Sequence, residues 1–179
     1  MKKLIYLAPI AVLAVLAAMF MVGLGRDPKT IPSVLIDRPV PQFALEALPE
    51  RGKPLSSADL KGDVSLVNIF GSWCVACIAE HPILVRIQET EDVPIHGIAW
   101  REKDPRDALR WLARNGDPYD RVGHDADSRV AIDFGVTGAP ETFVVDKQGV
   151  IRYKHIGPVT PEVWENTLKP LVEQLRKTS

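Results

Sequence analysis

The chain of 179 residues has two cysteines, and both lie in the stretch FGSWCVACIAEHP at residues 70–82. Cys74 and Cys77, two residues apart, can bind zinc, bind Cu(I), form a permanent structural disulfide or exchange a disulfide with another molecule. A structural disulfide that closes so short a loop constrains the unfolded chain little. Zinc requires two further ligands, and no paired ligand spacing is found among the four histidines, His81, His96, His124 and His155. The spacing therefore favours redox chemistry, with Cu(I) binding as the alternative.

The position of the pair between a predicted strand and a predicted helix strengthens this interpretation. The apolar run VSLVNIF at 64–70 predicts a buried strand, and the apolar spacing over 75–91 predicts a helix. Cys74 then lies at the start of the helix, where free backbone N–H groups and the helix dipole lower the pKa of a thiol. We therefore expect Cys74 to be exposed and to attack a foreign disulfide. Cys77, nearly one turn further on and facing inward, would resolve the mixed disulfide.

The first 25 residues differ from the rest of the chain. Lys2 and Lys3 precede an uncharged apolar run from Leu4 to Leu24, which is long enough as a helix to cross a membrane. This pattern predicts an uncleaved signal-anchor over 1–25, and a cleaved signal peptide is the alternative. The usual orientation of such a segment places the remainder of the chain outside the cytoplasmic membrane, where disulfides persist.

The rest of the sequence predicts a stalk and one globular domain. Residues 26–40 are polar and contain three prolines, which is typical of a stalk, and the domain extends over 41–179. The net charge of −1 gives no reason to expect a nucleic-acid partner. After residue 91 the patterns predict a strand, two helices, a β-hairpin and a closing helix, at 93–100, 104–116, 127–134, 142–155 and 160–175. This order predicts an α/β domain with a central mixed sheet and helices on both faces.

Two motifs resemble those of a known family. The sequence WCVAC after a buried strand looks like the WCxxC of thioredoxin folds, and GVTGAPETF at 135–143 resembles the loop that brings a cis-proline beside that motif. Together with DKQGVIRYKHIGP at 146–158 and the N-terminal anchor, these motifs resemble the CcmG/DsbE family over residues 38–175. The resemblance implies a thioredoxin-like fold and a membrane-tethered thiol:disulfide interchange protein of cytochrome c maturation. We expect no metal and no cofactor beyond a redox-active Cys74–Cys77 disulfide.

The resemblance also implies roles for residues around the cysteines. Ala139–Pro140 would be the cis peptide, and the exposed backbone of Ala139 would pair with an extended substrate segment. Trp73 would pack beside the active site and supply apolar surface on which a partner docks.

An amide stands where thioredoxin has a buried acid, six residues before its first cysteine: here that residue is Asn68. Because an amide cannot relay a proton as a carboxylate can, deprotonation of Cys77 needs other help, from Glu80 or Glu141. By the resemblance, Glu141 lies in an acidic patch near the sulfurs and would modulate their pKa values. The alternative is that both glutamates are ordinary solvated carboxylates.

Two other features near the motif favour ordinary structural roles. His81 follows Cys77 by four residues, and we expect it to be a surface or packing histidine rather than a ligand. The charged run at 101–104 is expected to be a solvated loop at the end of a strand.

The residues between the cysteines bear on the direction of electron flow. Val75 and Ala76 offer no charge that would strongly stabilise a thiolate, which favours a reductant. The resemblance has the same implication: reduced Cys74 attacks the disulfide in the haem-attachment CxxCH of apocytochrome c, directly or through an intermediate thiol carrier. A transmembrane thiol-reducing donor would restore the pair on the periplasmic side of the inner membrane, where a single-pass anchor raises the local concentration of partners. The alternatives are a general periplasmic thiol oxidase or reductase with another client, and a Cu(I)-delivering binding protein.

Overall fold

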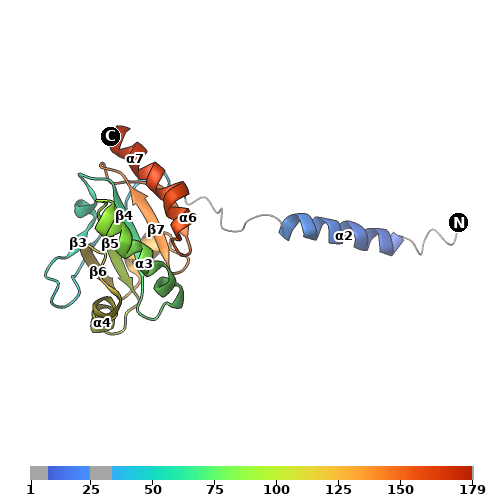
Figure 1. The fold of residues 1–179 in the computed structure, drawn as a ribbon. Coiled ribbons are helices and arrows are strands. Elements are labelled where there is room, and N and C mark those ends of the chain that lie inside the picture. The colour runs from blue at the N-terminus through green and yellow to red at the C-terminus, as the bar shows by residue number, and fades with distance from the viewer. Residues whose placement is uncertain (1–7, 25–33, 179) are drawn as a thin grey trace. The chain divides into compact units, whose positions relative to one another are not determined.

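The computed structural model describes residues 8–24 and 34–178, which fall into two separate units (Figure 1). The first contains helix α2, Ala8–Leu24, and the second is a globular domain. Within the described residues no helix is at once long enough and apolar enough to cross a membrane. Residues 1–7 and 25 of the predicted anchor and residues 26–33 of the predicted stalk lie outside the described part of the chain.

A six-stranded mixed sheet forms the centre of the globular domain, in the order β1-β8-β7-β4-β5-β6. Its strands are β1 (Arg38–Pro39), β4 (Ser65–Phe70), β5 (Ile95–Trp100), β6 (Arg121–Asp125), β7 (Glu141–Val145) and β8 (Val150–Ile156). Strands β4, β5 and β6 run parallel, β7 is antiparallel to β4 and β8, and β1 is antiparallel to β8. The predicted mixed sheet and the predicted hairpin of β7 and β8 are confirmed.

Helices cover both faces of this sheet (Figure 1). One face packs against α3 (Val75–Thr90), α4 (Pro105–Asn115) and a C-terminal helix made of α6 (Pro161–Val163), the π-helical segment η2 (Trp164–Leu168) and α7 (Lys169–Thr178). The other face packs against α5 (Arg129–Asp133) and the 3-10 turn η1 (Ser57–Leu60). The core therefore has two layers, one on each side of the sheet, as the order of strands and helices in the sequence predicts.

The edge strand β6 is an element that the sequence patterns do not predict. β6 has the sequence RVGHD, in which Val122 is the one large apolar residue, so it lacks the alternation of a typical strand. A small second sheet, of β2 (Ala44–Leu45) and β3 (Leu55–Ser56), packs on β6. A Cβ atom at Gly123 would lie 2.7 Å from the Cβ of Leu45. Glycine at this position therefore lets the two sheets approach.

The pairing of β4 with β7 brings the two sequence motifs together. Asn68 on β4 lies opposite Thr142 on β7, and Ile69 lies opposite Glu141. Because side chains alternate across a strand, Asn68 and Thr142 point to the α3 side of the sheet, and Glu141 points to the α5 side. At its carboxyl end β4 leads through a short turn directly to Cys74 and α3.

Candidate active site

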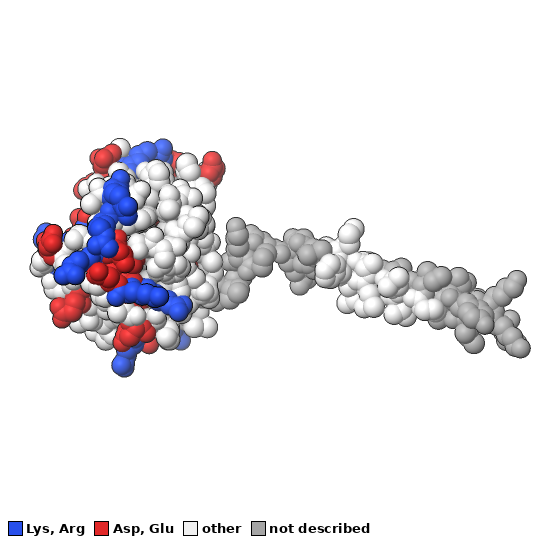
Figure 2. All heavy atoms as spheres, turned by 90° about the horizontal axis from the view of Figure 1, so that it is seen from below, with Lys and Arg blue, Asp and Glu red and all other residues white. Residues whose placement is uncertain are grey.

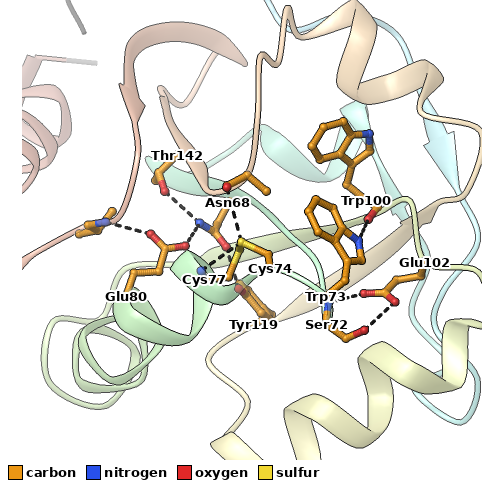
Figure 3. The surroundings of a disulfide bond; sticks show 12 residues. Asn68, Ser72, Trp73, Cys74, Cys77, Glu80, Trp100, Glu102, Tyr119 and Thr142 are labelled. Atoms are coloured by element: carbon orange, nitrogen blue, oxygen red, sulfur yellow. Dashed lines mark hydrogen bonds between the residues drawn. A yellow bond between two sulfur atoms is a disulfide. The ribbon is translucent and has the colours of Figure 1, made fainter.

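Cys74 is the N-cap residue of α3, and a disulfide joins its sulfur to that of Cys77 (Figure 3). The backbone N–H of Cys77 donates to Cys74 Sγ over 3.1 Å. In a reduced pair, a donor and a helix dipole placed in this way favour the thiolate form of Cys74. The predicted position of the first cysteine at the start of a helix is confirmed.

The cis-proline loop covers the disulfide. The Ala139–Pro140 peptide bond is cis, as the resemblance implies, and the carbonyl oxygen of Ala139 lies 3.5 Å from Cys74 Sγ. Only 4% of Cys74 and 1% of Cys77 are exposed. The expectation of an exposed Cys74 is therefore wrong for the disulfide form, because a loop 65 residues further along the chain packs on this sulfur.

Trp73 borders the disulfide on the opposite side from Glu80, and half of it is exposed (Figure 3). Its Nε1 donates to the carbonyl oxygen of Trp100 over 3.0 Å, and the two indole rings meet edge to face. Since this bond satisfies the polar atom of Trp73, the exposed remainder of the ring is apolar. Val75 and Ile78 on α3 are also largely exposed. The apolar surface that the resemblance implies for partner docking is thus present beside the cysteines.

A buried hydrogen-bond network lies next to the disulfide. Asn68 Nδ2 donates to Glu80 Oε1 over 2.9 Å and to Thr142 Oγ1 over 3.0 Å, and the hydroxyl of Tyr119 donates to Asn68 Oδ1 over 2.7 Å (Figure 3). The backbone N–H of Val159 donates to Glu80 Oε2 over 2.9 Å. The sequence patterns single out neither Tyr119 nor Val159. Both lie on segments that meet α3 only in the folded domain.

Burial of the network changes the acidity of its carboxyl group. Glu80 is 1% exposed, and this burial raises its pKa from 4.5 to about 7, although the hydrogen bonds from Val159 and Asn68 favour the charged form. Burial likewise raises the pKa of Tyr119. The alternative of a solvated Glu80 is wrong. Near neutral pH the Glu80 carboxyl can both release and accept a proton.

Glu141 has a different environment, on the α5 side of the sheet. Its Oε1 accepts from the backbone N–H and the hydroxyl of Thr137 and from the N–H of Gly138. Its Oε2 lies 2.9 Å from Nζ of Lys154, a lysine on β8 whose side chain is itself buried. The alternative of a solvated Glu141 is therefore wrong. The expected acidic patch is wrong as well, because the carboxylate is paired with a buried lysine. The carboxylate holds the loop that precedes Pro140, and any influence on the sulfurs remains a prediction.

Two further residues near the motif are buried. His81 packs edge-on against Trp111, and its Nε2 lies 2.8 Å from the carbonyl oxygen of Gly116, so the expected packing role is confirmed. Glu102, within the charged run expected to be solvated, is only 4% exposed. It accepts from the backbone N–H of Ser72 and, over 2.8 Å, from its hydroxyl. The expectation was wrong here because this partner lies 30 residues away in the sequence.

The chain is similar to known proteins in sequence and in fold. The family model described as Redoxin matches residues 36–173. The thiol:disulfide interchange protein DsbE of Allochromatium vinosum is 43% identical over 93% of this chain and 91% of that protein. DsbE of Pseudomonas aeruginosa is 42% identical over 98% of this chain and 96% of that protein. The solved structure of a secreted thiol-disulfide isomerase from Corynebacterium glutamicum has a TM-score of 0.64 at 26% identity, covering 75% of this chain and 85% of that one.

These matches agree with the geometry of the cysteine pair. The Redoxin match contains both cysteines and the cis-proline loop, and the DsbE proteins align with this chain over nearly their whole length. The chain therefore belongs to the Redoxin family, and within it to the DsbE (CcmG) proteins, which makes it a thiol:disulfide oxidoreductase.

Proposed function

We propose that this protein is a periplasmic dithiol reductant that keeps the haem-attachment cysteines of apocytochrome c reduced during cytochrome c biogenesis. The observation that carries the proposal is the hydrogen bond from the Cys77 N–H to Cys74 Sγ at the start of α3, which makes Cys74 the thiolate nucleophile. Membership of the DsbE family supports the choice of client. The uncharged Val75 and Ala76 between the cysteines support the direction of electron flow.

Exchange begins when the Cys74 thiolate attacks one sulfur of the client disulfide. The bond between the client sulfurs breaks, one of them leaves as a thiolate that takes up a proton, and a mixed disulfide links the client to Cys74. Cys77, once deprotonated, attacks Cys74 Sγ, and the second client sulfur leaves in the same way. The client has then gained two electrons and two protons, and this chain is left with the Cys74–Cys77 disulfide. A transmembrane thiol-reducing donor returns two electrons to it.

The surroundings of Cys74 support docking of an extended client segment. The carbonyl oxygen of Ala139 lies beside the attacking sulfur, so a segment that pairs with this backbone brings its own disulfide to Cys74. Trp73, Val75 and Ile78 present exposed apolar surface around the same point. In this proposal apocytochrome c, or an intermediate thiol carrier, docks at this surface.

Glu80 is the proposed acceptor of the Cys77 proton. It follows Cys77 by three residues, so the two buried side chains lie on the same face of α3. Its pKa of about 7 matches the task near neutral pH. Asn68 orients the carboxylate without taking the proton. Glu141 acts indirectly in this scheme, by holding the loop that carries Ala139 against the sulfur.

The proposed location is the periplasmic side of the inner membrane, with residues 1–25 as a single-pass anchor. Ala8–Leu24 contains no charged residue, and the apolar run of the sequence begins earlier, at Leu4. Large apolar side chains of α2 are exposed: Val12, Leu13, Val15, Leu16, Met19, Phe20 and Met21. Such a surface is suited to lipid. An anchor would hold the redox domain close to its membrane-bound partners.

The equilibrium reduction potential of the Cys74–Cys77 pair tests the proposal. We expect a value below about −180 mV, the potential of protein disulfide isomerase, and far from the roughly −120 mV of the strong oxidant DsbA. A value near that of DsbA would instead favour a thiol oxidase. Tight, stoichiometric Cu(I) binding by the reduced protein, without exchange of an apocytochrome c disulfide, would favour the copper-delivering alternative.

A further inference from the structure

An open pocket of about 460 Å³ lies beside Trp73. Six residues line it: Ser72, Trp73, Arg101, Glu102, Lys103 and Asp107. They come from the turn before Cys74, the loop after β5 and the first turn of α4. Figure 3 shows Ser72, Trp73 and Glu102 on the opposite side of the disulfide from Glu80. The mechanism proposed above uses Trp73 alone among these residues, which leaves the charged side chains of the pocket without a role.

The acidic side chains of the pocket have partners within the domain, whereas its basic side chains form no ion pair among the described residues. Glu102 is buried and accepts two hydrogen bonds from Ser72, and Asp107 forms an ion pair with Arg110 on α4. Within the part of the chain that the structure describes, neither Arg101 nor Lys103 forms an ion pair with a carboxylate, and both residues are exposed. The pocket therefore offers two cations to a ligand, whereas its carboxylates are already occupied.

The backbone of Arg101 supports a ligand-binding role. Its φ of +55° lies in the left-handed region, which residues other than glycine, asparagine and aspartate rarely adopt. Residues held in such conformations are concentrated at active sites and ligand clamps. The guanidinium lies 5.6 Å from the ring centre of Trp100, and Trp100 in turn contacts Trp73 edge to face. Arg101 thus lies beside Trp100, which contacts the tryptophan that precedes Cys74.

We propose that this pocket binds an acidic side chain of the client, close in sequence to the disulfide that Cys74 attacks. Arg101 and Lys103 bind the carboxylate, and the exposed ring of Trp73 packs against its methylene groups. This inference rests on the proposed function and adds a preference among clients. The long-range field of the domain does not supply such a preference, because residues 34–179 contain more acidic than basic residues and Figure 2 shows basic and acidic side chains intermixed on the face it displays.

The test uses the reduced full-length protein and synthetic peptides with one internal disulfide between cysteines two residues apart. Glu, Gln or Lys is placed at each of a few positions on either side of the disulfide, and the second-order rate constant of reduction is measured. At the position that reaches the pocket, we expect the Glu peptide to react about two- to fivefold faster than the Gln peptide, as for a partly exposed ion pair. The Lys peptide should react more slowly than the Gln peptide, and high salt should reduce both differences.

Two double variants separate the pocket from a general charge effect. Arg101→Gln/Lys103→Gln should bring the ratio of the Glu and Gln rate constants close to one. Arg106→Gln/Arg114→Gln removes the same number of cations from exposed positions of α4 outside the pocket and should keep the ratio. If the ratio of the Glu and Gln rate constants also falls to one in Arg106→Gln/Arg114→Gln, the pocket assignment is overturned. Equal rates for all three peptides with the wild type would overturn it too while leaving the reductant function intact, whereas failure to reduce any peptide would overturn both.

Discussion

Asn68 donates its side-chain amide to the carboxylate of Glu80 over 2.9 Å, in the buried layer next to the Cys74–Cys77 disulfide. Thioredoxin has an acid at the position of Asn68, so the titratable group of this site has a different place in the sequence. In the proposed mechanism the amide of Asn68 orients the carboxylate, and Glu80, three residues after Cys77, takes up the proton. This division of roles can be tested separately in the kinetics and in the stability of the protein.

Replacing Glu80 by Gln removes the proposed proton acceptor at nearly constant volume. We expect resolution of the mixed disulfide by Cys77 to slow by about tenfold or more, since general base catalysis is worth at least this much. In the wild type the resolution rate should rise with pH through about 7, where Glu80 becomes ionised. Release of client thiol from a preformed mixed disulfide measures this rate. Glu89→Gln, at an exposed position of α3, is the control, and the same pH profile in Glu80→Gln and wild type would exclude Glu80 as the base.

The same carboxyl group should make the stability of the oxidised protein depend on pH. Burial raises the pKa of Glu80 from 4.5 in the unfolded chain to about 7 in the folded domain. Between these values the folded state keeps a proton that the unfolded chain has lost, so the free energy of unfolding falls as the pH rises. The loss amounts to about 3 kcal/mol and is complete above the folded pKa. Burial lowers the pKa values of His81 and His96, which produces the opposite trend.

Comparison with Glu80→Gln isolates the Glu80 contribution from that of the histidines. Both proteins are unfolded with denaturant at pH 5 and at pH 8. From the lower to the higher pH, the free energy of unfolding of the variant should rise by about 2 to 3 kcal/mol relative to that of the wild type. A difference between the two proteins that stays constant over this range would mean that Glu80 is ionised in the folded state at pH 5.

The buried pair of Glu141 and Lys154 should be strongly coupled. Lys154→Met leaves the Glu141 carboxylate buried without its cation, and we expect a loss of about 3 kcal/mol or more in the free energy of unfolding. Adding Glu141→Gln to Lys154→Met should restore part of the loss, because the neutral amide needs no cation. A double-mutant cycle by denaturant unfolding measures the coupling. Additive effects of the two substitutions would show that the pair contributes nothing as a pair.

The absence of a side chain at Gly71 leaves room for the Trp73 ring. A Cβ at residue 71 would lie 2.5 Å from Nε1 of Trp73, so we expect Gly71→Ala to displace the indole and break its hydrogen bond to the Trp100 carbonyl. We expect a changed Trp73 indole N–H resonance and slower reduction of a protein client. Gly138→Ala is the matched control for the resonance, because a Cβ there meets no atom within 4 Å. An unmoved Trp73 resonance in Gly71→Ala would show that the backbone shifts in place of the ring.

Local features of the sequence predict the centre of the site, and long-range packing determines its surroundings. The strand, turn and helix around Cys74 are adjacent in the chain, so the N-cap position follows from residues 64–91 alone. The cover over Cys74 comes from Ala139, and the second donor to Glu80 comes from Val159, 79 residues away. Hydrophobic patterns carry no information about such polar contacts. For the same reason the burial of Glu102, whose partner is Ser72, could not be predicted.

The most direct test of the account is capture of the mixed disulfide with the Cys77→Ala variant. This variant retains the nucleophile and lacks the resolving thiol, so an apocytochrome c peptide with an oxidised CxxCH motif should accumulate as a covalent adduct on Cys74. Mass spectrometry identifies the linked cysteines, and Cys74→Ala should form no adduct. A folded Cys77→Ala protein with a free Cys74 thiol that captures no peptide would contradict the assignment of Cys74 as the attacking sulfur.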